Sequence, residues 1–192
     1  MLIKALCDYY DILSKAGKVL PEGYSNVGIH YLVSLTPEGK VDVITDYQDR
    51  IPEILKNGKT KIQTNPKTVR MPKRTEKSAI DSNIIEHRPL YLFGLSYAEN
   101  SMDADDKKAQ KSHEACVKTN LEFLEGLDSP VVNAYRNFLQ NWEPENEIHN
   151  GKLIELGKKY NTFRFAFCLS GNPDILLHED PAVKKKWGQR IQ

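Results

Sequence analysis

The segment VGIHYLVSLTPEGKVDV (residues 27–43) determines which class of fold to expect from this chain. Every second residue from Val27 to Leu35 is apolar, and the alternation resumes at Val41 and Val43 after the intervening PEGK. Alternation with a period of two places side chains on opposite faces of a strand, and Pro and Gly are typical of turns between strands. The segment therefore predicts a β-hairpin with its turn at residues 37–40.

Helical periodicity lies on both sides of this segment. Apolar residues at spacings of three and four predict an amphipathic helix at residues 2–13 and two further helices at 109–124 and 131–142. Ser129 and Pro130 predict the N-cap and the first residue of the third helix. We expect the second and third helices to pack together as a helical hairpin.

The last part of the chain predicts one more strand and one more helix. Alternation at residues 163–169 is typical of a strongly apolar strand that returns to the sheet. Asp180 and Pro181 predict the start of the last helix. This helix reaches the end of the chain without a stop signal, as we expect of a piece of a longer protein.

Together the patterns predict an α+β fold, in which the N-terminal helix and the helical hairpin pack on a small antiparallel sheet and a basic loop projects. With 192 residues, 40% of them hydrophobic, one sizeable core is favoured, so we expect a single domain over residues 1–192.

No apolar run approaches the roughly 20 residues of a membrane span. Three cysteines in apolar contexts predict no disulfides, so we expect a cytoplasmic protein with no membrane partner.

Positive charge is concentrated in KNGKTKIQTNPKTVRMPKRTEK (residues 56–77). Eight Lys and Arg residues stand there against the single acid Glu76, a net +7, whereas the whole chain carries +1. Proline and glycine punctuate the segment, which predicts a loop or an irregular edge. A local excess of positive charge is typical of a segment that binds a polyanion. The alternative interpretation is a solvated Lys-rich loop without a binding role.

Catalytic and metal-binding patterns are weak. The run Gly-Lys-Thr at residues 58–60 is similar to the end of a phosphate-binding loop, but Glu53 stands where its first glycine belongs. His113 and Cys116 share a predicted helix, and no other potential ligand has metal-binding spacing, which favours a packed His and a core Cys. We expect no catalytic residues, no metal and no cofactor.

Several segments along the whole chain carry a resemblance to a known family. They are MLIKALCDYYDIL (1–13), PEGY (21–24), MPKRTEKSAI (71–80) running to YLFG (91–94), KSHEACVKTNLEFLEGL (111–127), AYRNFLQNWEPEN (134–146) and FRFAFCLSGNPDILLHEDPAVKKKW (163–187). In this order they resemble the large subunit of type I-C CRISPR systems, and the resemblance covers the N-terminal domain of that subunit.

This resemblance implies a DNA-binding domain of Cascade, the surveillance complex guided by crRNA. In that family the N-terminal domain contacts the duplex beside the target, helps to recognise the protospacer-adjacent motif and promotes strand opening, while a separate helicase-nuclease degrades DNA. The implied partners are double-stranded DNA at the target flank, crRNA and the other Cascade subunits. The sequence leaves open a further partner, an anti-CRISPR inhibitor that mimics DNA.

Two positions depart from the family pattern. An Arg-Thr-Ser-Gly-Ile run is replaced by RTEKSAI (residues 74–80), in which Ala79 lacks the backbone freedom of glycine. An Asp-Asn pair is replaced by His87 and Arg88, so the hydrogen bonds of that pair are not carried over.

The resemblance implies a mechanism with two separate recognition steps. The guide RNA recognises the target by base pairing, and the protein recognises only a short flanking motif. Candidates for base-edge contacts are Gln63, Asn65 and Ser78. Candidates for phosphate or groove contacts are Lys56, Lys59, Lys61, Lys67, Arg70, Lys73, Arg74 and Lys77. A general RNA-binding module and a metal-dependent nuclease are the alternatives.

Overall fold

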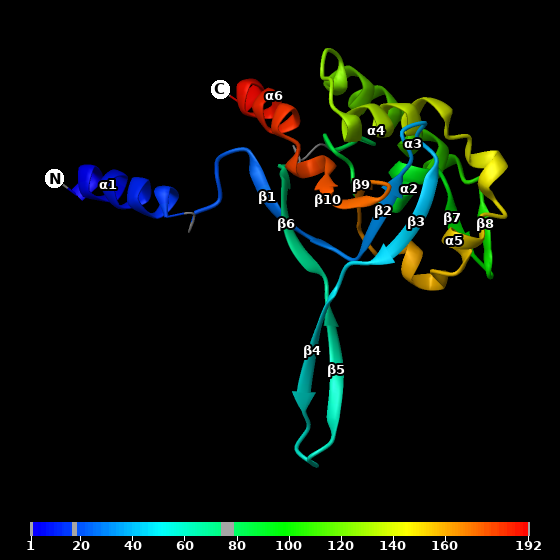
Figure 1. The fold of residues 1–192 in the computed structure, drawn as a ribbon, viewed down its shortest axis with the longest axis horizontal. Coiled ribbons are helices and arrows are strands. Elements are labelled where there is room, and N and C mark those ends of the chain that lie inside the picture. Colours follow the sequence, from blue (N-terminus) through cyan, green and yellow to red (C-terminus); the bar gives the residue numbers. More distant parts are fainter. Residues whose placement is uncertain (1, 17–18, 74–78, 192) are drawn as a thin grey trace.

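The computed structural model of the chain has a body of helices and strands from which two elements extend (Figure 1). One is helix α1 (Leu2–Lys15), and the other is an arm made of β4 (Asp49–Ile54) and β5 (Thr60–Asn65). The mixture of helices and small sheets confirms the predicted α+β class. The structure describes residues 2–16, 19–73 and 79–191.

A four-stranded sheet with the order β10-β9-β2-β3 lies at the centre of the body. The antiparallel pair β2 (Tyr31–Leu35) and β3 (Val41–Asp46) confirms the predicted hairpin, with its turn at residues 37–40. On the other side of the sheet, β9 (Phe165–Leu169) pairs in antiparallel fashion with β10 (Asn172–Leu176), which confirms the predicted apolar strand near the C-terminus.

The two central strands, β2 and β9, are parallel, so the prediction of an antiparallel sheet was wrong. Their register runs from Tyr31 beside Phe165 to Leu35 beside Leu169. A parallel pair needs a long crossover connection. The connection here includes α2 (Pro89–Phe93), α3 (Lys107–Leu124) and α4 (Pro130–Asn141). Alternation reveals that a segment is a strand but not the direction in which it pairs.

The alternation that begins at Val27 is divided between two sheets at His30. β1 (Tyr24–Ile29) pairs with β6 (Lys67–Pro72) in a separate antiparallel ribbon. His30 marks the change of partner, since its backbone N–H donates to the Arg164 carbonyl over 2.9 Å and its Nδ1 accepts from the Arg164 N–H over 3.1 Å. The ribbon covers the sheet face opposite the main core through a small apolar cluster of Ile29, Leu32, Met71, Ala166 and Cys168.

Helices cover the other face of the sheet, and the two predicted caps, Ser129 and Asp180, are confirmed. Ser129 Oγ accepts from the Val132 N–H and donates to Asp180 Oδ2 over 2.7 Å, which joins the caps of two helices. Asp180 Oδ1 in turn accepts from the first turn of the last helix. The remaining elements are β7 (Ser96–Ala98), β8 (Ser101–Asp103), η1 (Pro144–Glu147), α5 (Gly151–Ile154), η2 (Gly157–Asn161), η3 (Leu177–Glu179) and α6 (Pro181–Ile191).

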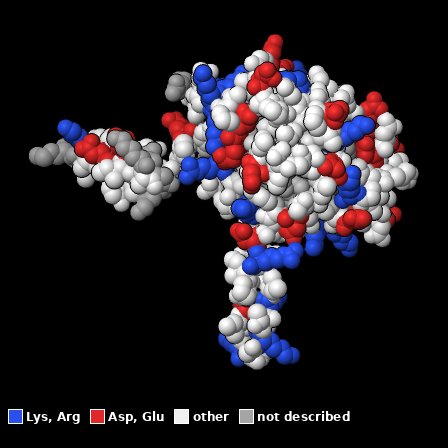
Figure 2. All heavy atoms as spheres, in the orientation of Figure 1, with Lys and Arg blue, Asp and Glu red and all other residues white. Residues whose placement is uncertain are grey.

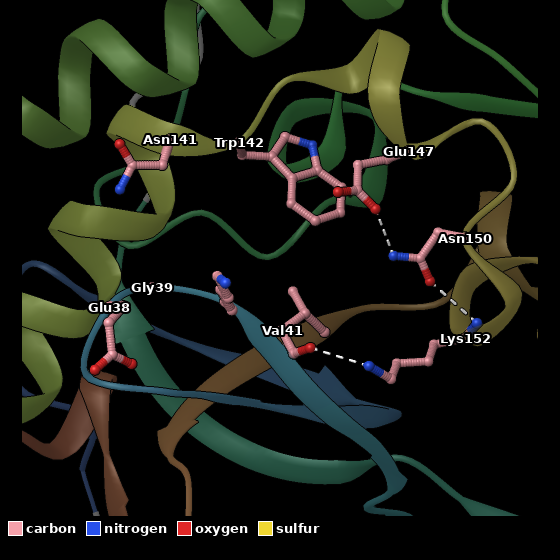
Figure 3. Close-up of a pocket in the computed structure, with 9 residues that line it drawn as sticks. Glu38, Gly39, Val41, Asn141, Trp142, Glu147, Asn150 and Lys152 are labelled. Carbon is pink, nitrogen blue, oxygen red and sulfur yellow. Dashed lines mark hydrogen bonds between the residues drawn. The ribbon is translucent and has the colours of Figure 1, made fainter.

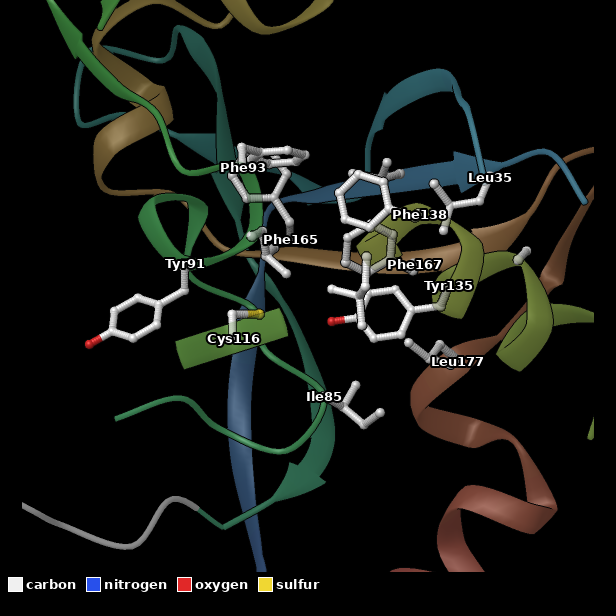
Figure 4. Close-up of a cluster of buried hydrophobic side chains, with 14 of the residues drawn as sticks. Leu35, Ile85, Tyr91, Phe93, Cys116, Tyr135, Phe138, Phe165, Phe167 and Leu177 are labelled. Carbon is white, nitrogen blue, oxygen red and sulfur yellow. The ribbon is translucent and has the colours of Figure 1, made fainter. Parts of the chain in front are cut away.

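Aromatic side chains fill the main core between the sheet and these helices (Figure 4). The rings of Phe93 and Phe165 meet edge to face with centroids 5.5 Å apart, and Tyr135 lies 4.9 Å from Phe167. Such pairs add to the free energy gained by burying their area. The core therefore ties β9 to α2 and α4 at once.

Helix α1 confirms the predicted helix but does not pack on the sheet, so that part of the prediction was wrong. Figure 1 shows it lying away from the body. An apolar stripe predicts that one face of a helix has to be covered, but it does not identify the covering surface. The large apolar side chains of α1, each between 49% and 78% exposed, are Leu2, Ile3, Leu6, Tyr9, Tyr10 and Ile12.

Replacing Phe165 by Ala tests the aromatic core. Phe165 is fully buried and contacts the rings of Phe93, Tyr31 and Tyr160, so the substitution leaves a cavity. We expect the free energy of unfolding to fall by about 3–5 kcal/mol, measured by denaturant titration followed by circular dichroism. Ile175→Ala, at an exposed position on β10, is the control, and a similar loss in both variants would contradict this view of the core.

Candidate nucleic-acid interface

The basic segment is mainly strand, so the prediction of a loop was wrong. It contains the turn of the arm, all of β5 and all of β6. Pro52, opposite Ile62 in the arm, is tolerated because each strand of a two-stranded ribbon has a free edge, where a missing N–H costs no hydrogen bond. Asn57 and Gly58 form the turn: Gly58 has a φ of 76°, and Asn57 Oδ1 accepts from the Lys59 N–H over 3.1 Å.

The arm has two different faces, because directly paired residues point to the same side of a ribbon. Asn65, Gln63 and Lys61 pair with Asp49, Ile51 and Glu53 on one face, which we call the polar face. Thr64, Ile62 and Thr60 pair with Arg50, Pro52 and Ile54 on the other, which we call the apolar face. The register thus places Lys61 in one row with Gln63 and Asn65, the two base-edge candidates that the structure describes.

No described residue of the body covers the arm. Every residue of its two strands is exposed except Asn65, which is half-buried. Ile54 and Ile62 are 78% and 63% exposed, which is unusual for isoleucine. Figure 2 shows Lys and Arg side chains at the tip and at the base of the arm, whereas charges of both signs are mixed over the visible face of the body.

The remaining predicted contacts do not form one surface with the arm. Arg70 lies beside Asn26 on the outer side of the β1–β6 ribbon, and exposed Lys73 donates its backbone N–H to the Gly23 carbonyl over 2.7 Å. Lys67 lies on the opposite side of β6 from Arg70, and its ammonium is 4.7 Å from the centroid of the Tyr47 ring. Three further candidates lie outside the described residues: Arg74, Lys77 and Ser78.

The comparison with protein families gives a match that spans almost all of the chain. The family described as CRISPR-associated protein (Cas_Csd1) matches residues 6–192. The chain belongs to the Csd1 family. This is the family of the type I-C Cascade large subunit, a structural subunit that is not known to be catalytic. A search of curated proteins found no match to the chain.

In this Csd1-family chain the departure at His87 and Arg88 has a structural role. Arg88 donates through Nε and Nη2 to the fully buried Glu86 carboxylate, over 2.9 and 2.7 Å. Burial acts to raise the pKa of Glu86, but the hydrogen bonds and charge of Arg88 outweigh it and hold that pKa below its ordinary value. The Arg88 guanidinium also lies 3.6 Å from the centroid of the Tyr91 ring, so it anchors the chain just before α2.

The histidine and cysteine of α3 are packed, as predicted. His113 Nδ1 lies 3.0 Å from the Tyr91 carbonyl oxygen, and Cys116 is fully buried, which raises the pKa of its thiol. Among the described residues, no group of three or more His, Cys, Asp and Glu side chains could hold a metal ion. Within the same residues, no helix combines the length and apolar character needed to cross a bilayer.

Substitution of Arg88 by Met tests the buried ion pair. Glu86 would remain buried without its partner, so we expect a loss of about 3–5 kcal/mol in the free energy of unfolding at neutral pH. The pKa of Glu86 would then be raised, so the loss relative to the native chain should shrink as the pH falls and the carboxylate becomes protonated. Denaturant titrations at several pH values measure both effects.

The double variant Glu86→Gln with Arg88→Met is the control for this prediction. Because it removes both charges, it should be less destabilised than Arg88→Met alone. Equal losses in the single and double variants would show that stacking of the Arg88 guanidinium on Tyr91, not the ion pair, explains the effect.

Proposed function

We propose that the arm contacts duplex DNA beside the target of a crRNA-guided complex and that its polar face reads a short flanking motif. The observation that carries this proposal is the row of Lys61, Gln63 and Asn65 on one face of a projecting ribbon. A two-stranded ribbon fits the major groove of B-DNA, where amide side chains can distinguish base pairs. Membership of the Csd1 family supports a place in a CRISPR complex.

The lysines of the arm supply the affinity in this proposal. Lys56 and Lys59 flank the Asn57-Gly58 turn at the tip, and Lys61 begins the polar row. At about 3.4 Å per residue, the six residues of β5 extend roughly 17–20 Å, comparable with half a turn of the duplex. Phosphate contacts at the tip would therefore fix the position of the arm while the polar face meets the bases.

Apolar side chains near the tip give the arm a means to aid strand opening. Ile54 and Leu55 are exposed next to the tip lysines. Apolar side chains inserted at a base step unstack it and lower the cost of separating the strands. Capture of the duplex by the lysines would hold these side chains against the DNA.

Removal of charge from the arm should flatten the salt dependence of DNA binding. For Lys56→Ala, Lys59→Ala and Lys61→Ala combined, we expect the log-log slope of affinity against salt to fall by up to about 0.9 for each phosphate that the arm no longer neutralises. The measurement is a titration of target duplex with the reconstituted complex and its guide. Alanine at three exposed lysines of α3 is the matched control: Lys107, Lys108 and Lys111.

An unchanged slope in the arm variant, with the same circular dichroism as the native chain, would remove the arm from the interface. Competition by single-stranded RNA addresses the alternative of a general RNA-binding module. If such RNA competes better than the target duplex, that alternative is favoured.

Asn65→Ala separates base reading from phosphate contact. Its amide can both donate and accept, so we expect a loss of about 1–3 kcal/mol of preference for the favoured flanking motif, with little change for a scrambled one. Lys59→Ala should weaken both by similar factors. The matched control is Thr64→Ala, on the apolar face, and an equal effect of Asn65→Ala on both motifs would move base reading to another residue.

A further inference from the structure

A second candidate site lies on the body, where a pocket of about 570 Å³ opens between the β2–β3 turn and the chain that leads from α4 to α5 (Figure 3). Trp142 and Glu147 line one side of it, and Val41 lies across from them. Its size is in the range of pockets that bind small ligands. The other lining residues are Glu38, Gly39, Lys40, Asn141, Asn150 and Lys152.

The walls of the pocket are held in place by contacts within the chain. At Gly39, with a φ of 85°, a Cβ atom would lie 2.2 Å from the Phe138 backbone nitrogen, so the turn rests directly on α4. Asn137 Nδ2 donates to the Pro37 carbonyl over 2.8 Å, and Lys152 Nζ donates to the Val41 carbonyl over 3.1 Å. The site therefore exists without a ligand to order it.

Trp142 is fixed as a flat platform. Its Nε1–H donates to the Phe93 carbonyl over 2.9 Å, and its ring packs against Phe93 and Phe138 with centroids 5.4 and 5.1 Å away. The indole is nevertheless only partly buried and lines the pocket. An aromatic ring held in one orientation loses little entropy when a second ring stacks on it.

Glu147, Asn150 and Lys152 are hydrogen-bonded within the chain, whereas two other polar side chains of the pocket are free to bind a ligand. Within the described part of the chain, the exposed side chains of Lys40 and Asn141 make no hydrogen bond. The two lysines of the pocket are balanced by Glu38 and Glu147, so the site has no net charge. Such a balance disfavours a polyphosphate, which needs a strongly positive site.

We propose that this pocket binds a single unpaired nucleotide, with its base stacked on Trp142, its phosphate at Lys40 and its base edge at the amide of Asn141. Stacking on an aromatic side chain is the common way in which proteins hold unpaired bases. The site is separate from the arm, and it would hold a strand outside the duplex. Two sources share this chemistry, the guide RNA and a displaced DNA strand, and the 2′-hydroxyl distinguishes them.

Binding of oligouridylate and oligothymidylate to the full chain tests the proposal by fluorescence polarisation. Lys40→Ala with Asn141→Ala should weaken binding of at least one oligonucleotide about tenfold or more, because the ligand loses a charge-assisted contact to its phosphate and a hydrogen bond to its base. Both side chains are exposed, so the fold should be retained. Lys118→Ala, at an exposed position on α3, is the matched control and should leave binding unchanged.

Photo-crosslinking of a 4-thiouridine oligonucleotide, mapped by mass spectrometry, provides a second measurement on the native chain. Crosslinks to the peptide that contains Trp142 would support the proposal. Crosslinks confined to the arm, or unchanged affinity in the pocket variant, would overturn it. Those outcomes would not contradict the proposed contact between the arm and duplex DNA, because that proposal is tested by substituting the arm lysines and not the pocket residues.

Discussion

The parallel pairing of β2 with β9 is the constraint on which the rest of the structure depends. It joins segments from opposite ends of the chain, and every element from β3 to η2 lies between them in the sequence. Closing so long a connection costs chain entropy, which the contacts made on closure must offset. The edge-to-face pair of Phe93 with Phe165 and the ring of Tyr135 against Phe167 are formed only when β9 is in place. The arm and the pocket thus take their positions from this core, to which the exposed arm contributes little.

Local features of the fold were predictable from the sequence because neighbouring residues determine them. The caps at Ser129 and Asp180 and the β2–β3 turn follow from hydrogen bonds made within a few residues. The direction of β9 and the surface that covers α1 were not predictable, since both depend on distant segments. The division of the first strand at His30 also depends on a distant residue, because Arg164 fixes it.

The candidate site was predictable in composition but not in arrangement. The charge of the basic segment identified it as a candidate site. Asn57 and Gly58 are typical of a hairpin turn and could have indicated the arm, but the prolines of the segment led to the prediction of a loop. The pairing register then decides which residues share a face, and charge alone gives no indication that Lys67 lies over Tyr47. The pocket at Trp142 joins a strand turn to a helix end about a hundred residues later, so no local pattern could reveal it.

The exposure of the arm has a consequence for how the protein can evolve. Substitutions there leave no cavity, because almost none of its side chains is buried. A change in what the arm contacts therefore requires no compensating change in the core. As a result, the sequence of the arm can diverge rapidly while the body that carries it stays the same.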